Sequence, residues 1–472
     1  MGGHIWYTFG VALFAAIGTF LFGFDTGIAT TTIAHQSWKE YMGHPSQGLT
    51  GAVPSVYIAG EAIGALTQMA IGDRLGRIRF MQLMCAVVTI GCTIQTASVN
   101  IGMFLAGRVV AGFAVGGMVA TVPVYLSEIS APQHRGLIGG ISGVGIAFGT
   151  MASNWVGYAC AWAPYGALQW RLPLGIQLPW GVIMFIGLAT FMPNSPRQLI
   201  RQGKIEEAKR EFIKIRRDLL SHVVHEEFTL MKAQIEYEMQ RELTSYREIF
   251  KLYRHRVLVS VAVQTMTALT GVNVIQYYQT TLYDSLGVSA MNILALSGVY
   301  GTIAFIVNTL TTMYLTDQWG RRKMILAGMG GIIIIEIYTA VMQREFQYNN
   351  NRVDGMLNST TWLYGAEVLP INMRSKVMGL AAASHFIVNV AVTEAGPTAF
   401  AHIQENYYYV FVGCTLFFFT IAYFYFPETK KKTLEEIAAS FGDRVVEIED
   451  LDAATEDAVM EAKAQGEHIE ES

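Results

Sequence analysis

The sequence predicts an all-α membrane protein made of two similar helical bundles, and three observations support this fold class. Only 15% of its 472 residues are charged, while 52% are hydrophobic; ordinary soluble proteins are about one quarter charged. The apolar residues form charge-poor runs of about 20 residues, the length that crosses a bilayer. The same charged motifs recur in the same order in both halves. A soluble multidomain enzyme and a disordered chain are therefore excluded.

Eleven apolar runs are long enough to span a membrane. They cover residues 8–33, 49–71, 80–100, 101–126, 137–160, 172–192, 257–283, 291–316, 324–342, 377–400 and 407–426. A further run at 356–370 would form only about 22 Å of helix against a hydrocarbon core of roughly 30 Å. The polar stretch 344–355 stands where its outer half would be. We therefore expect nominally 12 transmembrane helices with the tenth shortened by an internal deletion.

Basic residues predict the orientation of these spans and the organisation of the chain. Fourteen of the 33 Lys and Arg lie between Arg197 and Arg256, which places this loop and both termini in the cytoplasm by the positive-inside rule. Mixed charge with helical periodicity predicts cytoplasmic surface helices in the loop. The expected domains are an N-terminal six-helix bundle (7–193), a cytoplasmic helical linker (194–256), a C-terminal bundle (257–427) and an acidic cytoplasmic tail (428–472).

Ten charged residues mark the repeat and indicate an internal duplication. They are Asp73, Arg74, Arg77, Glu128 and Arg135 in the first half, and Asp317, Arg321, Arg322, Glu367 and Arg374 in the second. They could be simple topology signals. Their paired recurrence favours an ion-pair latch that joins the two bundles on the inner side.

Several motifs make the chain resemble the sugar porters of the major facilitator superfamily, particularly the fungal members, over residues 7 to about 438. The motifs are GFDTG (23–27), DRLGRIR (73–79), PVYLSEISAPQHRG (123–136), PNSPR (193–197), GVNVIQYY (271–278), DQWGRRK (317–323), WLYGAEVLPINMRSK (362–376) and FPETKKKTLEE (426–436). The resemblance implies the two-bundle major facilitator fold and a secondary transporter of a monosaccharide or related polyol. It also implies alternating access, either coupled to protons or facilitative, and we expect proton symport.

The expected partners are therefore a sugar substrate, protons and the lipid bilayer. We expect a monomeric, multi-pass protein of the plasma membrane that is not an enzyme and uses no cofactor, metal or nucleic acid. In proton-coupled sugar porters that this chain resembles, the residue matching Asp25 is protonated and the residue matching Arg108 is its counter-charge. The alternatives are that Arg108 joins the cytoplasmic charges or that the two residues form a fixed structural pair.

Candidate sugar contacts are polar or aromatic side chains inside spans, because a sugar presents hydroxyl groups. They are Asn273, Asn308, Trp362, Asn389, Thr150, Thr267, Ser384 and His385, with Tyr277 and Tyr278 at the outer gate. Each alone could serve helix packing. The fifth and seventh spans lack the amides usual in this family, with Thr150 and Thr267 in their place, which argues against a standard glucose site. The shortened tenth helix leaves the alternative of a transport-defective or sensor-like sugar-binding homologue.

Overall fold

The structure is a computed structural model that describes residues 6–131, 134–216, 221–240, 254–285, 289–345, 371–403 and 406–427. Within these ranges the chain is helical and contains no β-strand. Ten helices are long and apolar enough to cross a membrane, or eleven when one bent pair counts as a span. Each of the eleven predicted spans overlaps one of these ten helices or the bent pair. Residues 356–370 lie outside the described residues, so the shortened tenth span stays a prediction.

The first half contains six spans. They are α1 (Trp6–Ala15) with α2 (Ile17–Ala34), α4 (Gln47–Leu75), α5 (Arg77–Thr96), α6 (Ile101–Ile129), α7 (Arg135–Cys160), and α8 (Leu168–Gly175) with α9 (Leu178–Thr190). A short helix, α3 (Gln36–Tyr41), follows the first span. Asn100 accepts a hydrogen bond from the Met103 backbone and so caps the start of α6, which satisfies one of its free N–H groups.

The second half begins with the bent pair α14 (Arg254–Leu269) and α15 (Val272–Ser285). Gly271 between them has φ +75° and lies against the ring of Phe411, two conditions that only glycine meets without strain. The remaining elements are α16 (Ala290–Leu310), the π-turn η3 (Thr311–Leu315), α17 (Thr316–Trp319), α18 (Arg321–Glu345), α20 (Ile371–His402) and α21 (Asn406–Tyr425).

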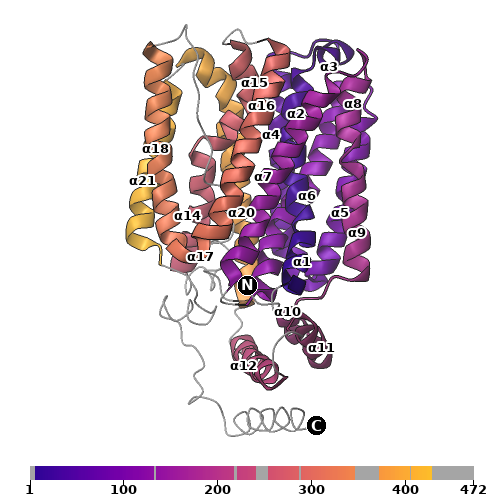
Figure 1. Ribbon diagram of the computed structural model, residues 1–472, viewed down its shortest axis with the longest axis vertical. Helices are drawn as coiled ribbons and strands as arrows, with labels where there is room; N and C mark the ends of the chain where they lie inside the picture. Colours follow the sequence, from indigo (N-terminus) through magenta and orange to yellow (C-terminus); the bar gives the residue numbers. More distant parts are fainter. Residues whose placement is uncertain are drawn as a thin grey trace.

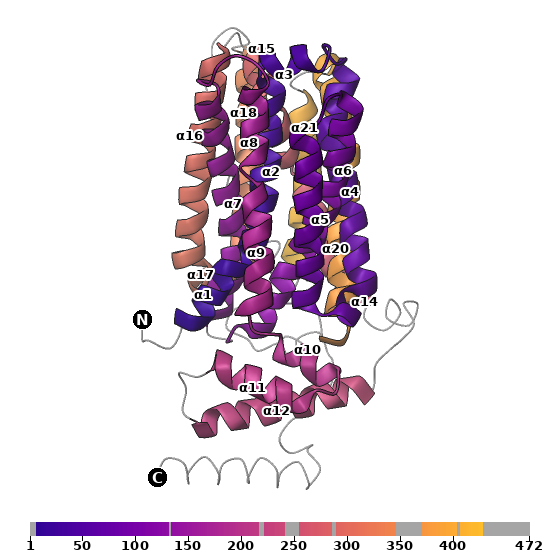
Figure 2. The same ribbon diagram turned by 90° about the vertical axis from the view of Figure 1, so that its right-hand side faces the viewer.

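Three helices of the linker lie together beyond one end of the spans (Figures 1 and 2), which we call the linker end. They are α10 (Pro196–Arg201), α11 (Ile205–Ile215) and α12 (Ser221–Gln240). Phe212 and Phe228 pack in a small core of their own, with ring centroids 5.6 Å apart. The prediction of surface helices in this loop is therefore confirmed.

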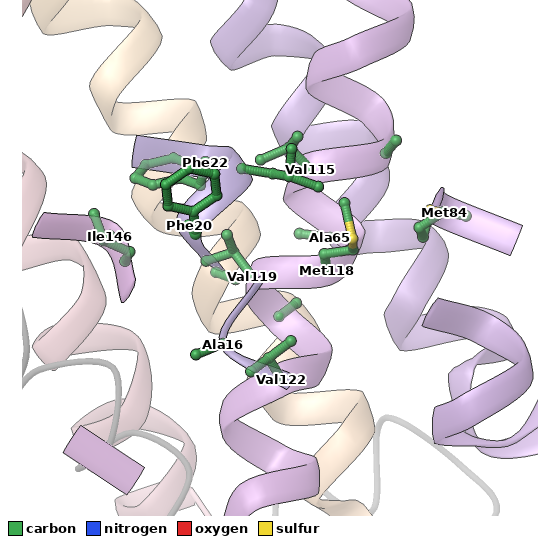
Figure 3. Close-up of a cluster of buried hydrophobic side chains, with 14 of the residues drawn as sticks. Ala16, Phe20, Phe22, Ala65, Met84, Val115, Met118, Val119, Val122 and Ile146 are labelled. Carbon is green, nitrogen blue, oxygen red and sulfur yellow. The ribbon is translucent and has the colours of Figure 1, made fainter. Parts of the chain in front are cut away.

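Glycines let the helices of the first half approach closely. A methyl carbon added to Gly64 of α4 would lie 1.9 Å from the carbonyl oxygen of Phe113 in α6, and one added to Gly23 of α2 would lie 2.0 Å from that of Ile146 in α7. Small residues at such crossings bring backbones together in membrane proteins. Phe20, Val119 and Met118 fill the space beside these crossings (Figure 3). The span of α6 is consequently the most buried of the described spans.

The two halves meet mainly where α4 packs against α20 and α7 against α16, with smaller contacts between α6 and α20 and between α2 and α15. Asn154 of α7 donates to the Ser297 carbonyl of α16 at 3.0 Å, and Trp155 donates to Thr302 at 2.8 Å. Large apolar side chains point outward from the spans, such as Ile334, which is 70% exposed. Such exposure suits a surface in lipid, so the chain is an integral multi-pass membrane protein.

The close crossing of α4 and α6 gives a test of the packing. Gly64→Ala is expected to destabilise the protein by about 1–3 kcal/mol, because the added methyl group forces two backbones apart. Thermal unfolding of the purified protein in detergent measures the loss. The matched control is Gly330→Ala in α18, where nothing lies within 4 Å of an added methyl group. The packing argument is wrong if both variants melt at the same temperature.

Candidate functional site

A buried ion pair joins Asp25 of α2 to Arg108 of α6. Arg108 Nη1 lies 2.7 Å from Asp25 Oδ2, and both side chains are at most 1% exposed. The guanidinium carbon also lies 3.9 Å from the centroid of the Tyr57 ring. Burying either charge alone in an apolar bundle would cost several kcal/mol. The structure therefore brings together the two residues that the sequence predicted for proton coupling.

This pair can respond to protonation. A proton on Asp25 removes the negative charge that holds Arg108, so the neutral acid binds the guanidinium more weakly. The pair connects the first span to α6, and α2 also contacts the second half through α15. A change in the Asp25–Arg108 ion pair therefore affects α2, a helix through which the two halves are in contact.

Asn273 and His385 are brought together in the second half. Asn273 Nδ2 of α15 lies 3.3 Å from His385 Nε2 of α20, and His385 Nδ1 lies 2.9 Å from the Gln264 carbonyl oxygen of α14. The carbonyl can only accept, so we assign the ring proton to Nδ1, which leaves Nε2 to accept from Asn273. His385 is thus a buried residue with two partners that orients Asn273.

Apart from Thr150, the other candidate sugar contacts that the structure describes lie on α14, α16 and α20. Ser384 donates to the Ala381 carbonyl and lies 3.2 Å from Thr265; Thr267 donates to Val263; and Asn389 accepts from Thr393 at 3.2 Å. Asn308 is half-buried on α16, and its Oδ1 has no hydrogen-bond partner among the described residues. Trp362 lies outside the described residues.

Gln276 connects Thr150 to the second half and was missed by the sequence reasoning. Its Nε2 lies 3.5 Å from Thr150 Oγ1, at the limit of a hydrogen bond, and Thr150 lies 3.4 Å from the Gly23 carbonyl oxygen. Gln276 follows Asn273 by three residues, so the two share a face of α15. This spacing within GVNVIQYY was the available signal.

The two tyrosines predicted at the outer gate point to different partners. Tyr277 is buried and lies near Thr26 of the first half, whereas Tyr278 donates to the Thr393 carbonyl of its own half at 3.1 Å. Of these two tyrosines, Tyr277 is therefore the one that lies against the other half. A second crossing, in which Ser55 of α4 donates to Glu394 of α20, was also missed.

Four of the first-half charges predicted for the latch are described, and three of them form one network. Arg77, which is 1% exposed, binds Asp73 at 2.6 Å and Glu128 at 2.9 Å. Ser195 donates to Glu128 at 2.6 Å, and Arg201 lies 3.6 Å from Asp73. This network ties the ends of α4, α5 and α6 to the linker helix α10. These ion pairs and hydrogen bonds join the first half to the linker.

For the remaining predicted latch residues, the structure gives one side-chain hydrogen bond, which stays within the second half. Arg74 is exposed, and Arg322 donates to the Tyr423 carbonyl of α21. The side chains of Arg135, Asp317, Arg321 and Arg374 and the whole of Glu367 lie outside what the structure describes. A latch between the bundles therefore stays a prediction. No group of three or more metal-binding side chains occurs among the described residues.

Comparison with known proteins places the chain among membrane transporters. The family described as "Sugar (and other) transporter" matches residues 11–357 and 354–441. The MFS-type transporter criB of Aspergillus cristatus is 30% identical over 91% of this chain and 92% of its own length. The low-affinity glucose transporter HXT3 of Saccharomyces cerevisiae is 28% identical over 91% of this chain and 81% of its own.

Solved structures show the same fold. The proton:xylose symporter XylE bound to 6-bromo-6-deoxy-D-glucose has a TM-score of 0.82 at 20% identity, covering 93% of this chain and all of that one. The human organic anion transporter MFSD10 has a TM-score of 0.59 at 14% identity. The predicted major facilitator fold is therefore confirmed, and these two likenesses show the fold alone.

The Arg77 network gives a stability prediction. Glu128→Gln is expected to lower the free energy of unfolding by on the order of 3 kcal/mol, because it removes a carboxylate from a buried ion pair. Chemical unfolding in detergent measures it. Glu207→Gln is the control, since Glu207 forms a half-exposed pair with Lys204 at 3.8 Å and should change stability by less than about 1 kcal/mol. Equal effects would contradict a stabilising role for the network.

Proposed function

Because the chain belongs to the sugar (and other) transporter family, we propose that it carries a monosaccharide or related polyol together with a proton by alternating access. It is a transporter rather than an enzyme. The observation that carries the proton coupling is the fully buried Asp25–Arg108 pair. A relative named as a low-affinity glucose transporter supports the choice of substrate.

The sugar site that we propose lies between the halves, among the polar side chains of α7, α14, α15, α16 and α20. Asn273 is its centre because His385 holds it in place, while Gln276 and Thr150 extend the polar surface into the first half. Asn308 and Asn389 offer further amide groups, and Thr267 and Ser384 offer hydroxyl groups. Trp362 completes the proposed site as a stacking surface for the sugar ring.

We assign the outer and inner gates from the end of the molecule at which the two halves are in contact. We assign Tyr277 to the outer gate, since it lies near Thr26 in the crossing of α15 with α2, and Tyr278 supports the same helix. The charged residues of the latch would close the opposite, linker end. Alternating access then consists of breaking one set of contacts while forming the other.

We propose that the linker end faces the cytoplasm, because fourteen of the 33 Lys and Arg fall between Arg197 and Arg256 in the sequence. We propose that both termini are cytoplasmic, that the protein is a monomer of the plasma membrane, and that the predicted domain boundaries hold. The two segments of the family match meet at residues 354–357. This break supports our proposal that the tenth span has lost a segment.

Neutralising Asp25 tests the proton coupling. Asp25→Asn is expected to abolish sugar accumulation against a gradient while leaving counterflow partly intact, because the amide mimics the protonated acid. Uptake and counterflow of labelled D-glucose and D-xylose, in cells lacking their own carriers, measure the two activities. Wild-type protein that moves neither sugar, or a variant that accumulates sugar as well as wild type, would overturn the corresponding part of the proposal.

Truncating Asn273 tests the sugar site. Asn273→Ala is expected to weaken sugar binding by about 1–3 kcal/mol, because a buried hydroxyl of the sugar and the His385 ring both lose a partner. Direct binding of labelled sugar to purified protein measures the affinity. Asn292→Ala, on the exposed start of α16, is the control and should bind as wild type does. Unchanged affinity in Asn273→Ala would place the substrate elsewhere.

A further inference from the structure

Protonation of Asp25 would leave Arg108 without a counter-charge inside the bundle. Arg108 is 0% exposed, and the ion pair that the structure gives it is the one with Asp25. A guanidinium keeps its charge at ordinary pH, so a proton on Asp25 removes the counter-charge but not the charge. An unpaired cation in such surroundings is costly. The protonated state therefore needs another group that stabilises Arg108.

The groups that remain around Arg108 come mainly from α4. The guanidinium carbon lies 3.9 Å from the centroid of the Tyr57 ring, well within the range of a cation–π interaction. Arg108 Nε lies 3.5 Å from the Val53 carbonyl oxygen, and Nη1 lies 3.4 Å from that of Asp25. Because both of these distances are near the limit of a hydrogen bond, the ring of Tyr57 is the strongest of the remaining contacts.

Helix packing fixes the Tyr57 ring in this position. Tyr57 is 0% exposed, and a methyl carbon added to Gly112 of α6 would lie 2.1 Å from the Tyr57 carbonyl oxygen. Gly112 follows Arg108 by one turn, so this close crossing holds α4 beside the guanidinium. The Tyr57 hydroxyl forms no hydrogen bond of normal geometry with the described residues. The ring, rather than the hydroxyl, is therefore the part of Tyr57 that acts on Arg108.

We propose that the Tyr57 ring stabilises Arg108 while Asp25 is protonated, and thereby sets the pH range in which the carrier takes up its proton. The proton binds the Asp25 carboxylate, the ion pair opens, and the guanidinium stays on the ring of α4. When the proton leaves on the other side of the membrane, the carboxylate binds Arg108 again. Tyr57 is a positioning residue that carries no proton itself. We call Asp25, Arg108 and Tyr57 the charge cluster.

This inference rests on the proposed proton coupling and adds a residue to it. While Asp25 is ionised, its carboxylate already cancels much of the field of the guanidinium, so the negative face of the ring gains little. Once Asp25 is protonated, the ring faces the full positive charge and the interaction is stronger. Removing the ring should therefore make Asp25 harder to protonate. Transport would then need more acidic conditions.

Other titratable side chains lie on the helices packed around Asp25, and the variants of Tyr57 leave them unchanged. Those that interact electrostatically with Asp25 are Glu61 on α4, Cys92 on α5 and Tyr277 on α15. The span of α20, which packs against α4, carries His385 and Glu394. On α7, the neutral Ser153 lies against Gly27. A difference among variants of Tyr57 therefore reports on the ring.

The test measures uptake of labelled D-glucose and D-xylose across a range of external pH. Tyr57→Leu is expected to shift the midpoint of acid-stimulated uptake downward by on the order of one pH unit. Tyr57→Phe keeps the ring and should stay near wild type. The control is Phe80→Leu, which removes another fully buried ring, on α5, and should not shift the midpoint.

Fluorinated phenylalanines incorporated at position 57 separate the ring's charge distribution from its packing. Added fluorine atoms weaken the negative face of the ring and largely keep its shape. The midpoint should therefore fall progressively from Tyr57→Phe as fluorine atoms are added. This series decides the question if Tyr57→Leu fails to fold.

A double-mutant cycle in thermal unfolding provides a second readout. In Asp25→Asn the guanidinium has lost its counter-charge, so adding Tyr57→Leu should lower the melting temperature by at least about 2 °C more than Tyr57→Leu does alone. Equal losses would show that the ring acts through packing and would overturn the inference. An unshifted midpoint in Tyr57→Leu or along the fluorinated series, with acid-stimulated wild-type uptake, overturns this inference alone. Wild-type uptake that ignores pH overturns the proton coupling itself.

Discussion

The rest of the structure depends on the need to neutralise Arg108 inside an apolar bundle. A guanidinium cannot lose its charge at ordinary pH, so the helices around α6 have to supply an anion and an aromatic face. Asp25 and Tyr57 do so from two different helices. In the proposed mechanism, the position of the first span relative to α4 and α6 is thereby coupled to the protonation of a carboxyl group. A transporter needs such a link between an ion and a helix arrangement.

Close helix packing makes this neutralisation possible. Gly112 of α6 leaves room for the Tyr57 backbone, and Gly116 leaves room for that of Glu61. Larger residues at these positions would move α4 away from Arg108 and open the cluster. The same device brings α2 against α7 at Gly23. The charge cluster and the glycine crossings are therefore one structural unit, in which backbone proximity sets the spacing of the charges.

The two halves are built differently despite their shared motifs. The described span of α6 is the most buried in the protein, whereas the spans of α16 and α18 are the least buried. In the repeat, the position of α6 corresponds to the tenth span, which falls in residues that the structure does not describe. The first half thus holds the buried Asp25–Arg108 and Arg77–Glu128 ion pairs, and the described part of the second half contributes polar groups such as Asn273 to the proposed sugar site. This division suits a carrier that binds its ion and its sugar on different bundles.

The sequence by itself predicted the spans and the repeat, because bilayer length and the cost of intramembrane charge leave direct traces in composition and spacing. Its motifs predicted the fold family and the Asp25–Arg108 pair through the resemblance to sugar porters. It also singled out Asn273 and His385 but not their contact. Only the tertiary structure decided which groups meet: His385 orients Asn273, Ser195 at the start of α10 donates to Glu128, and Gln276 reaches Thr150. Such pairings join residues far apart in the chain, and their distances are set by how closely the helices cross, which no local pattern records.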